Sequence, residues 1–206
     1  MPSPSLADLA ALGKLFETHS PRLLTMLERR LDPRLRRHVD AGTILNDAFL
    51  LAHQKWSEFR AKCSVSPFNE EEFKTTAFPW LYGLARNALI NAWRKQFGRN
   101  GNRRGEIGLS DAASVDLGSR LCDRGTPPVR AAARAEIKAR VRDAMQVLDE
   151  QDQDILWMRH YDDLKFGEIA EVLNIKENAA NVRYFRAMEK LRNSYLQSNG
   201  KPSGSE

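Results

Sequence analysis

Apolar residues recur at steps of three and four along most of this 206-residue chain, and this spacing is the feature that most limits its fold. Each such step advances about one turn of an α-helix, so these residues form a single stripe on the helix surface. No stretch shows the sustained alternation of apolar and polar residues that indicates a half-buried strand. The chain is therefore expected to be all-α. The two clearest stripes are Leu45, Ala48, Ala52, Trp56 and Phe59, and Leu81, Leu84, Ala85, Ala88 and Ala92.

Further helices are expected on both sides of these two. The first should begin at about Pro21, because proline is favoured in the first turn of a helix, and should continue through Leu31. Residues 64–76 are polar, contain Pro67 and lack a clean period, which indicates a loop between the two striped helices. In the C-terminal part the apolar spacing predicts helices around residues 137–148, 155–161, 166–173 and 180–191.

Composition changes after Phe97, where Gly, Arg, Asp and Ser become frequent up to the pair Pro127-Pro128. Such a segment favours a flexible linker. We therefore expect two small helical domains, at residues 21–96 and 134–193, joined by a linker at 97–133. Residues 1–20 are interpreted as an N-terminal extension, and residues 194–206, rich in Ser and Gly, as a disordered tail.

The formal net charge of +5 is a small basic excess that is compatible with a polyanionic partner without requiring one. The two cysteines, Cys63 and Cys122, match no metal-ligand spacing and cannot make a disulfide framework, which favours a reducing cytoplasm. No apolar run approaches the ~20 residues of a membrane span, and residues 1–10 lack a signal-peptide pattern. A soluble, cytoplasmic protein without membrane insertion is expected.

The last two predicted helices have the sequence pattern of a helix-turn-helix. Ala170 is small enough for a close helix crossing, Asn174 tolerates the positive φ that this turn commonly needs, and Ile175 supplies an apolar anchor. Amides can pair with adenine edges and arginines with guanine edges or phosphates, so the exposed face of the last helix suits a DNA major groove. The alternative is a solvated, charged surface helix. With Ala180, Tyr184, Ala187 and Leu191 on the core face, the opposite face presents Lys176, Glu177, Asn178, Asn181, Arg183 and Arg186.

Aromatic, amide and basic residues are interleaved on the second striped helix of the N-terminal half. Aromatic rings stack on bases, amides can hydrogen-bond base edges, and cations hold phosphates, so this helix suits unpaired nucleic acid. The alternative is that its aromatic residues belong to the core, which is more common at helical spacing. The candidate binding residues are Trp80, Asn87, Asn91, Arg94 and Lys95.

Residues for catalysis or metal binding are not evident in the sequence. The histidines have no metal-ligand spacing, no glycine-rich phosphate loop is present, and no nucleophile lies beside a base. We therefore expect no enzymatic activity, no catalytic residue, no metal and no cofactor.

Three segments resemble, in order and separation, the motifs of one protein family, the extracytoplasmic-function (ECF) type of bacterial RNA polymerase sigma factor. Residues 78–87, FPWLYGLARN, resemble its region 2, and residues 40–50, DAGTILNDAFL, resemble its core-binding helix. Residues 166–176 and 182–187 resemble its region 4. In the core-binding helix Thr43 and Asn46 replace residues that the family usually has, an acid and a Gln, whereas Asp47 keeps the second acidic position.

The resemblance implies a sigma factor, which gives RNA polymerase its promoter specificity and catalyses nothing itself. Region 2 would bind a coiled coil of the largest polymerase subunit and open the −10 element, with the loop at 64–76 capturing a flipped base. Region 4 would read the −35 element, with the polymerase flap as a further contact. An anti-sigma factor is another partner that the resemblance suggests. The core-binding residues implied are Ile44, Leu45, Asn46, Asp47 and Phe49.

Two other functions are compatible with a helix-turn-helix. A stand-alone DNA-binding regulator would need an N-terminal sensing domain, and residues 23–95 offer no evident phosphoacceptor or effector pocket. An adaptor that binds only proteins would leave the Asn and Arg residues of the last helix without a role.

Overall fold

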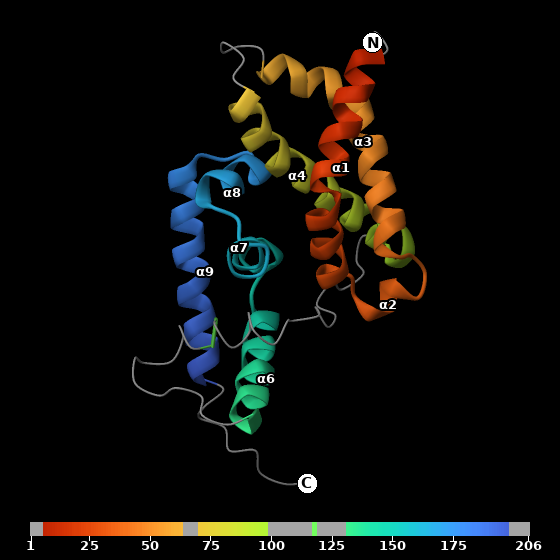
Figure 1. Cartoon of the computed structure of the whole chain (residues 1–206). Coiled ribbons are helices and arrows are strands. Elements are labelled where there is room, and N and C mark those ends of the chain that lie inside the picture. The colour runs from red at the N-terminus through yellow and green to blue at the C-terminus, as the bar shows by residue number, and fades with distance from the viewer. Residues whose placement is uncertain (1–5, 64–69, 99–116, 119–130, 198–206) are drawn as a thin grey trace. The chain divides into compact units, whose positions relative to one another are not determined.

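The computed structural model describes residues 6–63, 70–98, 117–118 and 131–197 (Figure 1). Every regular element within these ranges is a helix, which confirms the all-α expectation. The chain divides into two compact units, and each is described by itself. Unit 1 contains α1 to α4, and unit 2 contains α6, α7, α9 and Phe166–Ala170 of α8.

Unit 1 is built from three long helices and one short one, namely α1 (Leu6–Arg30), α2 (Pro33–Arg36), α3 (Ala41–Cys63) and α4 (Glu70–Phe97). The helices α1 and α3 pack side by side, and α4 packs against both (Figure 1). Each long helix contributes one apolar stripe to the core, and burial of each large side chain stabilises the unit by about 1.5–3 kcal/mol. The core includes Leu23 and Leu27 of α1, Ile44, Ala48 and Trp56 of α3, and Leu81, Tyr82 and Ala85 of α4.

Carboxylates fix the starts of α2 and α3. The Asp32 carboxylate accepts a hydrogen bond of 2.7 Å from the backbone N–H of Arg34, and the Asp40 carboxylate accepts one of 2.6 Å from that of Thr43. These bonds satisfy backbone donors that have no partner within the helix. The same contact with Thr43 lowers the pKa of Asp40.

The first helix starts earlier than the sequence predicts. It begins at Leu6 instead of about Pro21, so residues 6–20 are helix and not an extension, and Pro21 lies inside α1. Leu12, Leu15 and Phe16 are buried in the core of unit 1. Their packing against the other helices offsets the cost of an internal proline, so Pro21 does not mark the start of the helix.

The predicted loop between α3 and α4 is also shorter than expected. Residues 70–76 form the first turns of α4, so the loop prediction is wrong there, and residues 64–69 lie outside the described residues. The run of acidic residues at positions 70–72 suits a helix start, because negative charge is favourable at that end of the helix dipole. The missing apolar period hid this turn.

Unit 2 places two helices against the last one. Its elements are α6 (Ala131–Val147), α7 (Glu150–His160), the part of α8 (Phe166–Leu173) that ends at Ala170, and α9 (Glu177–Gln197), and α6 and α7 both pack on α9. The Gln153 side-chain amide donates to the backbone oxygens of Met145 and Leu148, at 2.8 and 3.0 Å. This amide therefore satisfies carbonyl groups at the end of α6 and fixes the turn into α7.

Both boundaries of unit 2 differ from the prediction. Residues 131–133, expected in the linker, are the start of α6, and Leu117 of the linker is fully buried in this unit. The neighbouring Gly118 approaches α6 so closely that a Cβ atom there would lie 2.3 Å from Cγ2 of Ile137. Residues 194–197, expected in the tail, continue α9, because Tyr195 is 1% exposed and packs under the Arg140 guanidinium. The rest of the predicted linker and tail, at 99–116, 119–130 and 198–206, lies outside the described residues.

Candidate nucleic-acid interface

The turn between α8 and α9 has the geometry that the sequence predicts. Asn174 has a φ of 52°, and the backbone N–H of Ile175 donates to the carbonyl oxygen of Ala170 at 3.0 Å. At the other end of α8, the Glu168 carboxylate accepts a 2.7 Å bond from the backbone N–H of Lys165. Both helix ends are thus closed by local bonds, and α9 starts directly after a tight turn.

The predicted DNA-binding residues of α9 differ in exposure. Lys176, Glu177, Asn178 and Arg186 are exposed, whereas Asn181 and Arg183 are half-buried. The Asn181 side-chain amide donates to the carbonyl oxygen of Glu177 at 3.2 Å, so part of its hydrogen-bonding capacity is already used within the helix.

Sequence reasoning missed two apolar residues on the same helix. Phe185 is 66% exposed and Val182 is 42% exposed, and both lie outside the core of unit 2. The signal was present, since neither residue fits the buried stripe set by Ala180, Ala187 and Leu191. An exposed phenylalanine beside Arg186 gives this face an apolar contact site as well as charge.

An aromatic cluster connects α9 to α7 and α8. The Tyr184 ring lies edge-on to Phe166 of α8 with 5.2 Å between centroids, and its hydroxyl lies 3.1 Å from Nε2 of His160 at the end of α7. The Arg159 guanidinium lies 5.3 Å from the Phe166 centroid. Tyr184, expected on the core face, is half-buried and connects the three helices.

An ion-pair cluster fixes the later part of α9. Lys190 pairs with the Asp149 carboxylate at 3.3 Å and with the Asp152 carboxylate, both at the start of α7. Asp152 is buried, and its backbone N–H donates to Asp149 at 2.9 Å. This bond and the Lys190 contacts lower the pKa of Asp149, and both carboxylates raise the pKa of Lys190.

In unit 1 the predicted base-binding residues lie on one side of α4. Asn87, Asn91, Arg94 and Lys95 are exposed; Asn91 lies four residues after Asn87, Arg94 and Lys95 lie three and four residues after Asn91, and Trp80 lies seven residues before Asn87. Trp80 is half-buried, and its ring stacks on Phe59 of α3 at 4.1 Å with an interplanar angle of 14°. The structure therefore brings amides, cations and one aromatic ring onto a common stripe.

The predicted polymerase-binding residues of α3 do not all reach the surface. Ile44 is fully buried, so its assignment to a docking surface is wrong; the stripe of Ala41, Ile44 and Ala48 faces the core. Asn46 and Asp47 are exposed, and Leu45 and Phe49 are half-buried. Phe49 packs edge-on to Phe16 of α1 at 4.9 Å. Leu50, which was not predicted, is 59% exposed on the same face as Asp47.

The described residues offer neither a metal site nor a membrane-spanning helix. These residues contain no group of three or more His, Cys, Asp or Glu side chains that could hold a metal ion. None of their helices has the length and apolar character needed to cross a lipid bilayer.

Comparison with known proteins gives the following matches. The family model described as Sigma-70, region 4 matches residues 138–191, which include α7, α8 and most of α6 and α9. The ECF RNA polymerase sigma-E factor of Haemophilus influenzae is 26% identical over 174 residues, which cover 83% of this chain and 84% of that protein. The RNA polymerase sigma-H factor of Pseudomonas aeruginosa is 26% identical over 152 residues, covering 73% and 70% of the two proteins.

A solved structure, that of CnrH in complex with the cytosolic domain of CnrY, aligns over 94% of this chain and 91% of that chain, with a TM-score of 0.49 and 20% identity. Because the first sequence alignment covers 83% of the chain, the similarity extends beyond the helix-turn-helix into unit 1.

Proposed function

This chain belongs to the ECF type of RNA polymerase sigma factors, and on that premise we propose how its two units share the recognition of a promoter. As a sigma factor it binds core RNA polymerase and promoter DNA and directs transcription initiation. Unit 2 reads the −35 element through α9, α4 of unit 1 opens the −10 element, and α3 binds core polymerase.

The exposed face of α9 is the observation that carries the proposal. Arg186 can donate to a guanine edge or to a phosphate, and Phe185 can contact a thymine methyl group. Both are exposed on the helix that follows the Asn174 turn. Because Asn181 is already bonded to Glu177, Asn178 is the better candidate for an adenine edge.

The stripe on α4 suits an unpaired strand. Extraction of a base from the duplex costs a few kcal/mol, which a protein without ATP recovers by binding the open state. Stacking on an aromatic ring contributes roughly 1–3 kcal/mol per base. Because Phe59 covers one face of Trp80, a base would stack on the other face, while Asn87 bonds a base edge and Arg94 and Lys95 hold phosphates.

The polymerase-binding surface is redefined by burial. Leu45, Phe49 and the exposed Leu50 supply its apolar contacts, and Asn46 and Asp47 supply polar groups beside them. Apolar contacts at the centre with polar groups around them are typical of protein interfaces.

The alternative of a stand-alone regulator is not favoured, because the similarity to sigma factors includes both units. Sigma factors are non-catalytic initiation factors, and we extend this to the absence of any enzymatic activity in this chain. We also infer a cytoplasmic location, where core polymerase acts. An anti-sigma factor stays a predicted partner.

Co-purification followed by transcription tests the proposal. The full chain should bind purified core polymerase, and the resulting holoenzyme should select one promoter class from a randomised duplex library. On a template with that promoter, run-off transcription should require the chain. DNA binding without core, combined with no dependence of transcription on the chain, would favour the stand-alone regulator.

A further inference from the structure

We propose that Arg36, Arg37, Arg94 and Lys95 form one phosphate-binding surface, here called the α2 basic cluster, which holds the DNA backbone that continues beyond the −10 bases. The inference rests on the proposed function of α4 and adds a second element, α2, to its DNA contact. Arg36 and Arg37 belong to no functional motif identified in the sequence.

Contacts between aromatic and basic residues place α2 against the end of α4. The Arg34 guanidinium lies 4.9 Å from the Trp93 centroid and 5.9 Å from the Phe97 centroid. Just after α2, the His38 ring lies 6.2 Å from Phe97, edge-on. The last turn of α4, which carries Arg94 and Lys95, therefore lies beside the end of α2, which carries Arg36 and Arg37.

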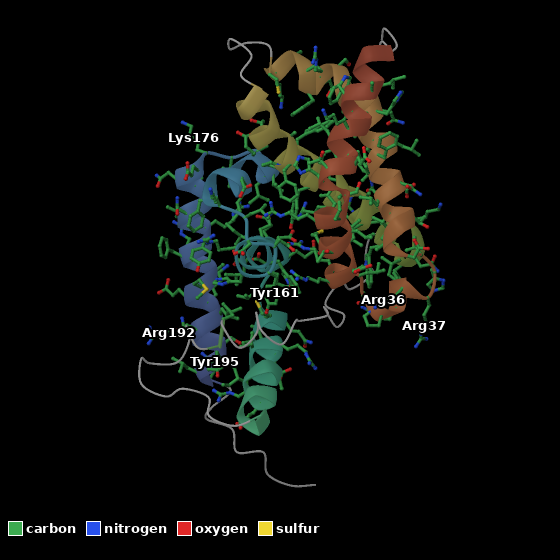
Figure 2. All side chains as sticks on the ribbon, viewed as in Figure 1. Arg36, Arg37, Tyr161, Lys176, Arg192 and Tyr195 are labelled. Atoms are coloured by element: carbon green, nitrogen blue, oxygen red, sulfur yellow. The ribbon has the colours of Figure 1, made fainter. Side chains whose placement is uncertain are left out.

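The arginines of α2 divide into one structural residue and two that are available to a ligand. Arg34 is committed to the fold, because it pairs with the buried Asp32 carboxylate at 3.0 Å and lies over Trp93. Arg36 donates through Nη2 to the Glu28 backbone carbonyl oxygen at 2.8 Å. This bond orients the guanidinium group, and because the carbonyl is uncharged it does not neutralise the arginine. Arg37 is exposed and has no ion-pair partner among the described residues. Figure 2 shows Arg36 and Arg37 together at the α2 end of unit 1.

Neighbouring acids do not neutralise this surface. Asp32 is buried under Arg34, and the Asp40 carboxylate caps the start of α3 through Thr43. Like Arg37, Arg94 and Lys95 have no ion-pair partner within the described ranges. Four cations from two adjoining helix ends therefore face solvent with their charge largely uncompensated.

A nucleic-acid backbone fits this arrangement better than an acidic protein does. The planar guanidinium group matches the geometry of a phosphate, and successive phosphates offer a row of negative charge. Arg94 and Lys95 continue the stripe of Asn87 and Asn91 to the last turn of α4, and α2 lies beside that helix end, so a strand held by these amides would reach the end of α4 next to Arg36 and Arg37. Such contacts raise affinity without reading sequence.

Holoenzyme binding to three promoter probes tests the cluster. The first probe holds the complete promoter selected by the holoenzyme, the second ends at the upstream edge of the −10 element, and the third ends at its downstream edge. The variants are Arg37→Gln, which keeps the Arg36–Glu28 bond, and the double variant Arg36→Gln/Arg37→Gln. The matched control is Lys14→Gln/Lys55→Gln, which removes two exposed cations of the same unit from α1 and α3. Thermal melting checks that each variant is folded.

On the complete probe the double variant should bind roughly tenfold or more weakly than the wild type at about 0.15 M salt. Its salt slope should be smaller by about two, and the salt slope of Arg37→Gln should be smaller by about one. The control variant should have the affinity and the salt slope of the wild type. The ratio of variant to wild-type dissociation constants should return to about one on both truncated probes, because both lack the backbone downstream of the −10 element. A return on the second probe alone would place the contact within the −10 element.

Three results would overturn the proposal. One is equal binding of the double variant and the wild type to the complete probe. Another is the same ratio on all three probes. The third is weaker binding of the double variant to core polymerase without DNA, which would indicate an acidic protein surface as the partner. Each presupposes an active wild-type holoenzyme, so failure of the proposed function would appear separately, as a wild-type chain that supports no run-off transcription.

Discussion

The ring of Trp80 lies nearly parallel to that of Phe59, with 4.1 Å between the centroids. This stack makes one side chain part of the α3–α4 contact and of the surface proposed to receive an unpaired base. Core residue and base platform were alternatives from the sequence, and the half-buried position of Trp80 permits both roles.

Substitution of Trp80 should separate these roles. Replacement of a fully buried large aromatic side chain by alanine lowers the free energy of unfolding by about 3–5 kcal/mol. Because the Trp80 ring is only half-buried, Trp80→Ala should lower it by about 1–3 kcal/mol. Trp80→Phe should retain most of that stability and part of the promoter opening. Phe59→Leu, which removes the stacking partner but leaves Trp80, serves as the control. If Trp80→Ala opened promoters normally in conditions where it is folded, Trp80 would have only its structural role.

Asn87 is the cleaner probe of strand opening, because its side chain is exposed and lies outside the hydrophobic core. Asn87→Ala should leave the binding of core polymerase and the thermal stability unchanged while reducing permanganate-detected opening of the −10 element. The defect should shrink on a template with a pre-melted bubble, because the cost of extraction is then already met. Normal opening by this variant would place the contact elsewhere on α4.

Charge reversal at Asp47 should weaken the complex with core polymerase. An unpaired charge at an interface commonly costs about 2–5 kcal/mol, so Asp47→Lys should reduce core affinity at least about tenfold with unchanged helical circular dichroism. Leu50→Ala should also weaken binding, whereas Glu58→Lys, an exposed position three turns along α3, should not. Equal affinity of Asp47→Lys and the wild type would remove Asp47 from the interface.

Arg186 and Phe185 should make different contributions to binding of the −35 element. If Arg186 holds a phosphate, Arg186→Ala should weaken binding to all sequences alike and lower the salt slope by about one. Phe185→Ala should instead relax preference at a thymine position with little change in the slope, because an apolar contact releases no counterions. Binding titrations on promoter variants at several salt concentrations measure both effects. Unchanged binding by both variants would make this face of α9 a solvated surface.

The ion-pair cluster around Lys190 predicts a pH dependence for unit 2. Folding lowers the pKa of Asp149 from its ordinary value of 3.8, chiefly through the bond from the Asp152 backbone N–H. A group of this kind stabilises the fold above its unfolded pKa, and that contribution is lost as the pH falls through the folded pKa. Thermal stability should therefore fall as the pH drops below the ordinary Asp149 pKa of 3.8, and Asp149→Asn should flatten this dependence.

Asp143→Asn, on the exposed face of α6, is the matched control and should leave the acid dependence as it is in the wild type. Identical acid unfolding of Asp149→Asn and the wild type would show that other carboxylates govern the acid dependence.

Lys190 predicts a dependence of the opposite sign at high pH, because folding raises its pKa. The stability that Lys190 contributes is present below its ordinary pKa of 10.5 and is lost as the pH rises through its folded pKa. Lys190→Met should therefore reduce the loss of stability in strong alkali.

Local patterns determined a large part of this protein. The three-and-four spacing predicted α3, most of α4 and the helices of unit 2, because helix formation depends on residues that are near in sequence. The turn at Asn174 was predicted for the same reason, since few residues tolerate its positive φ. The family motifs also lie in continuous segments, so they could be read without a structure.

Tertiary packing decided what spacing alone leaves open. A stripe of apolar residues has no fixed edge, so only the neighbouring helices show that Ile44 is buried and that Leu50 on the same helix is exposed. Pro21 can start a helix or lie within one. It lies within α1 because Leu12 and Phe16, which precede it, are buried in the core of unit 1. The meeting of α2 with the end of α4 joins residues about 60 positions apart, and the distance between such segments is set by the packed core and not by any local preference.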